Sequence, residues 1–229
     1  MSALSALCIT AVVIWTALVV IAQLLTPEQS PLSMGMSGLA RGPYGWVMKV
    51  AFVVRGVAAL ALVAAIPGSV PSEAQSTAGM ALLWVWGLGS ALLAVYATDM
   101  PGEAPSGAGK AHTFIALVAY VAAGIGMILV SVQLDDVEAT AWLARWALPI
   151  ALIAAVALLA QFAGFAAAAR DARAKTTPDA SSAAGAPGAA GAAGAASPSY
   201  GGLGRYAGLL QRVFLALVML WTVVVAAGI

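Results

Sequence analysis

Residues 112–133 read HTFIALVAYVAAGIGMILVSVQ, a run of 22 residues without Asp, Glu, Lys or Arg. A mostly apolar run of about 20 residues is long enough to cross the hydrocarbon core of a membrane as an α-helix. Five further segments of the 229-residue chain meet this condition: 3–25, 46–66, 78–98, 140–169 and 206–228. The chain is also 62% hydrophobic, with a mean hydropathy of +0.98. The sequence therefore predicts an all-α integral membrane bundle of six transmembrane helices.

Residues 176–204, between the last two apolar segments, are rich in Ala, Gly, Pro and Ser and poor in large apolar side chains. Such a composition cannot build a core, so we interpret this range as a flexible linker. The apolar segment 3–25 has no basic residue before it and is longer than the core of a signal peptide, which predicts a retained helix. We therefore expect a single transmembrane domain over residues 1–229, interrupted by the linker.

The basic residues are distributed unevenly between the two ends of the predicted bundle. Nine of the ten Lys and Arg residues lie in or next to the loops that follow the first, third and fifth apolar segments. The loops after the second and fourth segments carry acidic residues instead: Glu73, Asp135, Asp136 and Glu138. Because cytoplasmic loops of membrane proteins are enriched in Lys and Arg, we predict that the odd-numbered loops are cytoplasmic and that both termini are external.

The net charge and the numbers of His and Cys residues argue against several classes of function. A net charge of +1, without a basic stripe and interleaved aromatics, gives no reason to expect a nucleic-acid partner. With one His and one Cys in the sequence, a bis-histidine haem or a zinc site is not expected. A magnesium site on Asp99 and Glu103 is the remaining metal alternative, although two acids in a loop are more typical of a solvated surface. We predict no metal and no cofactor.

Polar residues gather near one end of the predicted bundle, on the side expected to be cytoplasmic. Asp99 follows the third apolar segment, and His112, the only histidine, opens the fourth. Arg55 lies nine residues beyond Trp46, a distance of ~14 Å along a helix. Arg212 lies one to two turns into the last apolar segment. Charged residues at such depth need a partner or a water-filled cavity.

Two arrangements of these residues remain open. In the first, Arg55, Arg212, Asp99 and His112 converge on one pocket at the cytoplasmic side. In the second, Arg55 and Asp99 form an ion pair that pins two helices together, while Arg212 and Lys49 extend to lipid head groups. The sequence does not fix the rotation of each helix about its axis, so it does not choose between the two arrangements.

The pocket arrangement suits an amphiphile with an anionic head group, such as a lipid or an isoprenoid-like molecule, bound from the cytoplasmic leaflet. The predicted ligand-binding residues are three basic residues and two aromatic ones: Arg55, Arg212, Lys49, Trp46 and Tyr96. An alternative is a membrane-embedded enzyme in which Asp99 and His112 are catalytic and transfer protons. A third class is a non-catalytic accessory subunit. Membrane lipids are the expected partners, and the oligomeric state is not predicted.

A short glycine-rich pattern precedes the second apolar segment. Gly35-Met36-Ser37-Gly38 resembles the Gly-x-Ser-Gly signature of rhomboid proteases, and His112 is expected on the same side of the membrane. In rhomboid proteases the serine lies within the bundle at the start of a helix, whereas Ser37 precedes the segment 46–66 by nine residues. We therefore interpret residues 35–38 as a glycine-rich turn before a helix.

Three longer stretches, 32–60, 87–124 and 202–228, resemble in order the successive segments of the bacterial six-helix membrane family known as domain of unknown function 998. The marks of this resemblance are an aromatic-led helix after a Ser- and Gly-containing loop, the Gly-x-x-His motif that ends at His112, and an arginine early in the last helix, Arg212. The chain departs from the pattern in Asp-Met-Pro at 99–101 and in its long linker. The resemblance implies a multi-pass protein of the bacterial cytoplasmic membrane, with no established biochemical activity.

Overall fold

The computed structural model describes residues 1–176 and 201–229. In this part of the chain it contains six α-helices, three short 3-10 helices and no strand. The α-helices are α1 (Ala3–Leu25), α2 (Gly45–Ser69), α3 (Thr77–Leu92), α4 (Gly107–Asp135), α5 (Glu138–Thr176) and α6 (Ala207–Gly228). The 3-10 helices are η1 (Met36–Ala40), η2 (Ser72–Ala74) and η3 (Gly202–Tyr206). The predicted all-α bundle of six helices is confirmed.

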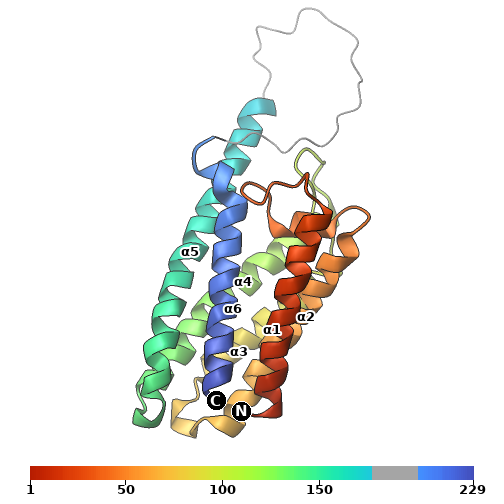
Figure 1. Ribbon diagram of the computed structural model, residues 1–229. Helices are drawn as coiled ribbons and strands as arrows, with labels where there is room; N and C mark the ends of the chain where they lie inside the picture. Colours follow the sequence, from red (N-terminus) through yellow and green to blue (C-terminus); the bar gives the residue numbers. More distant parts are fainter. Residues whose placement is uncertain (177–200) are drawn as a thin grey trace, which may run out of the picture.

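The six helices pack in chain order around a ring (Figure 1). Each helix contacts the next one along the chain, α1 closes the ring against α6, and α6 also contacts α2 and α4. Both termini lie at the same end of the bundle (Figure 1), where Ser5 Oγ donates a hydrogen bond to the carbonyl of Ile229 at 3.4 Å. The α1–α2 and α3–α4 loops lie together at the opposite end (Figure 1).

Five of the described helices, all except α3, are long and apolar enough to cross a membrane. The exception, α3, is equally apolar but has only 16 residues. At 1.5 Å per residue it measures ~24 Å, less than the hydrocarbon core of about 30 Å. The chain is therefore a multi-pass membrane protein in which one helix is shorter than its neighbours.

The structure corrects the predicted helix bounds around the polar loop. α3 ends at Leu92 rather than at residue 98, and α4 begins at Gly107 rather than at His112. Ser106 sets the start of α4, because its hydroxyl accepts a hydrogen bond from the N–H of Gly109 at 2.9 Å. Apolar residues continue past Leu92, so hydropathy alone did not show that the helix stops there. Residues 93–106 consequently form an irregular loop.

Small residues let α2, α3 and α4 approach closely. A Cβ atom at Gly56 would lie 2.7 Å from the carbonyl oxygen of Gly87, and one at Gly89 would lie 2.9 Å from Ala119 Cβ. In lipid, helix association relies on such close packing, because there is no hydrophobic force between helices. The approach of α2 to α3 also brings Arg55, which precedes Gly56, against Ser90.

The predicted linker at 176–204 falls mainly on residues 177–200, which lie outside the described residues. At both edges of the predicted range the structure contains regular helical structure. α5 continues through Thr176 and has 39 residues, extending beyond the predicted end at 169. On the other side η3 already packs against α5, and a Cβ atom at Gly204 would lie 2.9 Å from the backbone nitrogen of Ala168.

Candidate functional site

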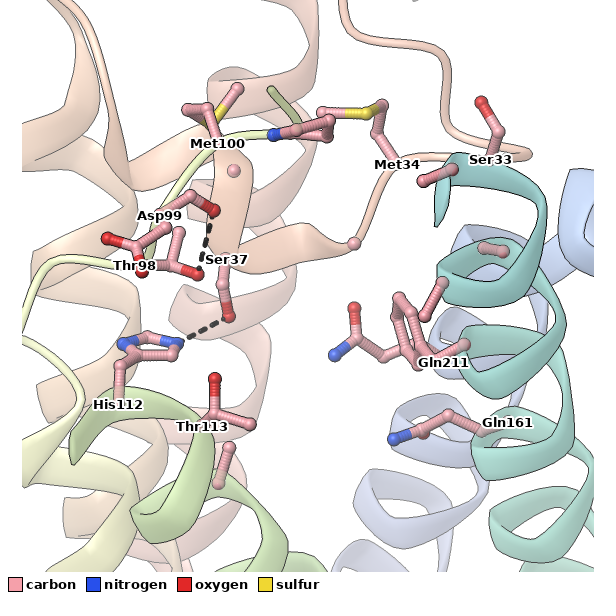
Figure 2. A pocket seen from close by; sticks show the side chains of 18 of the residues that line it. Ser33, Met34, Ser37, Thr98, Asp99, Met100, His112, Thr113, Gln161 and Gln211 are labelled. Atoms are coloured by element: carbon pink, nitrogen blue, oxygen red, sulfur yellow. Dashed lines mark hydrogen bonds between the residues drawn. The ribbon is translucent and has the colours of Figure 1, made fainter. Parts of the chain in front are cut away.

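A cavity of about 850 Å³ opens at the end of the bundle opposite the termini. The α1–α2 loop, the α3–α4 loop and helices α4, α5 and α6 all contribute to its lining (Figure 2). One part of the wall is apolar and is formed by Met34, Met100, Leu117, Phe162, Phe165 and the alanines at the end of α5. The polar side chains on the other parts include Ser37, His112, Thr113, Gln161 and Gln211. The cavity therefore presents an apolar surface and hydrogen-bonding groups to the same space.

His112 makes two hydrogen bonds at the edge of this cavity. Its Nδ1 lies 2.8 Å from the backbone carbonyl oxygen of Tyr96, and its Nε2 lies 2.9 Å from Ser37 Oγ (Figure 2). A carbonyl oxygen can only accept, so Nδ1 carries a hydrogen. In the neutral ring, Nε2 then accepts from the Ser37 hydroxyl. The side chain of His112 is 3% exposed and packs against Phe52, with 6.1 Å between the ring centroids.

Two glutamines face this pair from the other side of the cavity (Figure 2). The Gln211 Oε1 accepts the N–H of Met36 at 2.7 Å, which ties α6 to η1. Gln161 is 2% exposed, and its Oε1 has no hydrogen-bond partner within residues 1–176 and 201–229. A buried amide oxygen without a partner is costly, and a ligand with a donor group would satisfy it.

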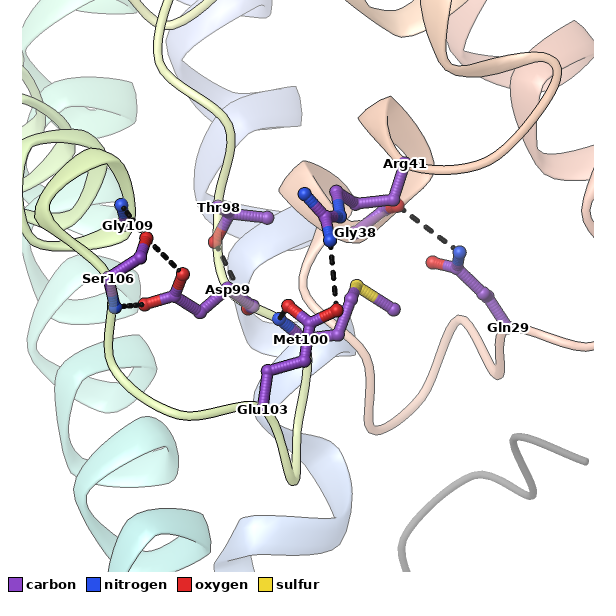
Figure 3. A network of polar contacts seen from close by, with 9 residues as sticks. All are labelled: Gln29, Gly38, Arg41, Thr98, Asp99, Met100, Glu103, Ser106 and Gly109. Carbon is purple, nitrogen blue, oxygen red and sulfur yellow. Dashed lines mark hydrogen bonds and ion pairs between the residues drawn. The ribbon is translucent and has the colours of Figure 1, made fainter. Parts of the chain in front are cut away.

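Asp99 lines the cavity from the α3–α4 loop, but its carboxylate is held by the start of α4 (Figure 3). It accepts from the Ser106 hydroxyl at 2.6 Å and from the Ser106 N–H at 2.9 Å. These hydrogen bonds, the hydroxyl first, lower the pKa of Asp99 below its usual value, and the more distant charges of Arg41 and Lys110 act in the same direction. A Cβ at Gly109 would overlap this carboxylate, so a side chain there would displace Asp99 from its position against Ser106.

Glu103, the second acid of the loop, points to different partners (Figure 3). Its Oε1 forms an ion pair with Arg41 at 2.9 Å, and its Oε2 accepts the N–H of Met100 at 2.7 Å. Asp99 and Glu103 are thus engaged separately rather than facing a common centre. Across the described ranges, no three His, Cys, Asp or Glu side chains gather as metal ligands would.

Arg55 is fully buried, at 0% exposure, and lies behind the cavity wall rather than in its lining. Its Nε donates to Ser90 Oγ at 3.2 Å, and its guanidinium carbon lies 5.5 Å and 5.7 Å from the ring centroids of Phe52 and Tyr120. Its two terminal nitrogens have no hydrogen-bond partner in the part of the chain that the structure describes. The predicted ion pair with Asp99 is not formed, so ring faces and one hydroxyl compensate this charge.

Arg212 is used to hold the α1–α2 loop. Its guanidinium donates to the carbonyls of Pro31 and Met34, each at 2.9 Å, to the carbonyl of Gly208 at 3.1 Å and to Gln23 Oε1 at 2.7 Å. Arg212 is half-buried and does not line the cavity, because these four acceptors hold its guanidinium. Of three residues in the first arrangement, Arg55, Arg212 and His112, the lining of this cavity contains only His112.

The other predicted ligand-binding residues also lie outside the lining. Lys49 and Trp46 are on an exposed face of α2, and Tyr96 contributes only its backbone carbonyl, to His112. Asp99 and His112 both line the cavity, but each bonds to other residues. Sequence reasoning set Ser37 aside and missed Gln161 and Gln211. A glutamine inside an apolar segment is the signal that could have found the last two.

A family model described as "Protein of unknown function (DUF998)" matches residues 9–228. No curated protein and no solved structure matches the chain. Because the match covers almost the whole sequence, the resemblance predicted from the three stretches is confirmed, and the chain belongs to this family.

Proposed function

We propose that this member of the DUF998 family binds a lipid- or isoprenoid-like amphiphile in the cavity at the loop end of its bundle. The observation that carries the proposal is the cavity itself. It has a volume of about 850 Å³, which is in the range of small-molecule sites, and it pairs apolar walls with a few convergent polar groups. An amphiphile satisfies both kinds of surface at once.

The apolar wall would hold the tail of such a molecule. Phe162 and Phe165 follow each other at helical spacing on α5, and Leu117 of α4 adds a side chain that is 45% exposed. An apolar chain that covers these side chains gains roughly 25 cal/mol for each Å² removed from water. On the predicted orientation the tail would enter from the cytoplasmic leaflet of the bacterial inner membrane.

The polar groups would hold the head. Gln161 Oε1 can accept a hydrogen bond from a donor on the head group. The ring of His112 and the hydroxyl of Ser37 can bind its oxygen or nitrogen atoms. The described lining contains the acids Glu28 and Asp99 and no Lys or Arg. The charge of Arg55, behind Tyr120, has no carboxylate partner among the described residues. Its electric field therefore favours an anionic oxygen of the ligand at the part of the cavity wall beside His112. A head group with hydrogen-bond donors and one anionic oxygen fits this arrangement.

The experiment is mass spectrometry of lipids that stay with the protein during purification in a mild detergent. Ala169→Trp, which places an indole in the cavity from α5, should reduce the retained amphiphile by tenfold or more. Ala163→Trp is the matched control, because Ala163 is exposed on the same helix and outside the lining. Equal retention by both variants, or no enriched amphiphile in the parent protein, would contradict the proposal.

An enzyme is the second candidate, as in the predicted alternative with Asp99 and His112 as catalytic groups. The observation that favours it is the contact between His112 and Ser37. Asp99 bonds to Ser106 instead of His112, so it does not support proton transfer at the imidazole directly.

A further inference from the structure

We propose that Ser37 and His112 form a nucleophile and general-base pair that cleaves a carboxylic ester of the bound amphiphile. This inference rests on the proposed function, since the amphiphile is the substrate. It assigns a covalent role to a serine whose sequence context alone indicated a turn.

Ser37 and His112 have the geometry of a nucleophile and its general base. Ser37 Oγ and His112 Nε2 are 2.9 Å apart, within the range of 2.6–3.2 Å expected for a nucleophile and its base. The Tyr96 carbonyl, 2.8 Å from Nδ1, fixes the ring tautomer so that Nε2 offers its lone pair to the hydroxyl. The Phe52 ring packs against the imidazole and limits its rotation. Three independent contacts therefore hold the base in a productive orientation.

Both residues of the pair are accessible from the cavity. A hydrogen bond that only joins η1 to α4 could be closed off from any cavity, but both residues line this one. Ser37 is half-buried, so its hydroxyl is reachable, whereas His112 is 3% exposed and largely shielded from water. Figure 2 shows the hydroxyl between the imidazole and the open space that Gln161 and Gln211 face. An ester carbonyl in this space can approach Oγ from the side away from the base.

The reaction follows from these positions. Ser37 Oγ attacks the ester carbonyl carbon, and its proton moves to His112 Nε2. The bond to the alcohol oxygen then breaks, Nε2 returns the proton to that oxygen, and the acyl group stays on Ser37. Water attacks the acyl carbon while giving a proton to Nε2. Release of Ser37 Oγ, which takes that proton back, completes hydrolysis to the alcohol and the carboxylic acid.

The partner of Nδ1 indicates why an ester is the expected substrate. In the triad of serine hydrolases, a carboxylate stabilises the imidazolium that forms during catalysis. Here a neutral backbone carbonyl takes that position, so the base is weaker. An alcohol is a better leaving group than an amine, and a weaker acid–base pair suffices for it. Esters are therefore favoured over amides.

The test uses the full chain in detergent or lipid nanodiscs and a long-chain alkyl fluorophosphonate, which reacts with activated serines. We expect mass spectrometry to place the adduct on Ser37 of the parent protein, so the main result needs no variant. His112→Gln keeps hydrogen bonding without a titratable base and should slow labelling by about 100-fold or more. Hydrolysis of p-nitrophenyl octanoate should fall in parallel, and Ser37→Ala should abolish both signals.

The controls separate this inference from a structural role and from the proposed binding. Ser69→Ala, on an exposed residue at the end of α2 outside the cavity, should label at the parental rate. No adduct on Ser37, or equal labelling of the parent and His112→Gln, would overturn the inference. If the parent still retains an amphiphile in that case, binding stands and catalysis fails. A labelled Ser37 without any retained amphiphile would instead overturn the proposed ligand class.

Discussion

Two loops close the same cavity but are held in place by different contacts. The α1–α2 loop is fastened from inside the bundle: Arg212 donates to two of its carbonyls, Leu209 N–H donates to the Leu32 carbonyl at 2.9 Å, and Gln211 accepts the Met36 N–H. The α3–α4 loop has one contact with the interior, from His112 Nδ1 to the Tyr96 carbonyl, and is otherwise held at the surface by the Arg41–Glu103 ion pair and by the Asp99–Ser106 hydrogen bonds.

The difference lies in how strongly water competes with each set of contacts. The bond from the Met36 N–H to Gln211 is buried, and the bonds of Arg212 to Met34 and Gln23 are partly buried, so breaking them leaves polar groups poorly hydrated. Exposed ion pairs exchange readily for water and contribute little. The α1–α2 loop should therefore unfold only with the bundle, and the α3–α4 loop should open locally at lower cost. The rigid loop carries Ser37, and the looser loop contributes Asp99 and Met100 to the lining of the same cavity.

The largest expected effect tests the rigid loop. Arg212→Met removes donors from three backbone carbonyls and from Gln23, so unfolding should become easier by about 3 kcal/mol. Thermal denaturation monitored by circular dichroism in detergent measures this. Arg205→Met is the matched control, because Arg205 is exposed and, among the described residues, donates to the hydroxyl of its neighbour Tyr206. A similar loss in both variants would erase the contrast between the two loops.

A smaller effect is expected from Gln211→Leu. The substitution leaves the Met36 N–H buried without its acceptor, which should cost about 1–2 kcal/mol. Because η1 carries both Met36 and Ser37, labelling of Ser37 should also slow. Measuring both the free energy of unfolding and the rate of Ser37 labelling would show whether Gln211 positions η1. Unchanged values of both quantities would mean that η1 is held by other contacts.

Asp99→Asn addresses the looser loop and should act locally. The variant weakens the contact with Ser106, so hydrogen exchange at Ser106 and Gly109 should accelerate while the melting temperature changes less than in Gln211→Leu. The pKa of Asp99 is lowered in the folded protein, so its stabilising contribution is present above the usual carboxyl pKa. This contribution is lost as the pH falls through the lowered pKa, below about 4.

For the parent protein we therefore expect exchange at Ser106 to accelerate in acid, and for Asp99→Asn we expect a smaller pH dependence. Exchange that responds to pH equally in both proteins would assign the effect to another carboxyl group.

The smallest effect is expected from Glu103→Gln. The Arg41–Glu103 pair is exposed on both sides, with 37% and 43% of the side-chain surfaces accessible. Removing its charge should change the free energy of unfolding by ~0.5 kcal/mol, and the difference should disappear at high salt. A loss comparable to that of Arg212→Met would show that the α3–α4 loop is as firmly held as its neighbour.

The helices could be predicted from the sequence because each apolar segment is long enough to register on hydropathy alone. Their ends were less accessible: α3 stops at Leu92 although apolar residues follow, since loop contacts and the Ser106 cap decide where regular structure ends. The depth of Arg55 and Arg212 was also predictable, but their partners were not. Those partners depend on the rotation of each helix and on the path of the α1–α2 loop.

The residues of the candidate site were hard to predict for the same reason, because their contacts depend on helix rotation and loop path. Ser37 and His112 are 75 residues apart, and their contact depends on a loop that folds back onto α4. The motif around Ser37 suggested chemistry, while its distance from the next helix argued against it. η1 resolves the conflict because it lies within the bundle end, tied to α6 through Met36 and Gln211. Gln161 was detectable only as a polar residue in an apolar segment, without any sign of what it faces.

The short α3 has a consequence for the surrounding bilayer. Its outward side chains include Trp84, Val85 and Leu88, which are 41–52% exposed and would contact lipid. With ~24 Å of helix against a hydrocarbon layer of about 30 Å, the acyl chains beside α3 must compress or the helix must shift along the membrane normal. This hydrophobic mismatch makes lipid chain length a variable of the protein itself. We expect a thick bilayer to strain the bundle mainly at α3, which leads directly into the α3–α4 loop that lines the cavity.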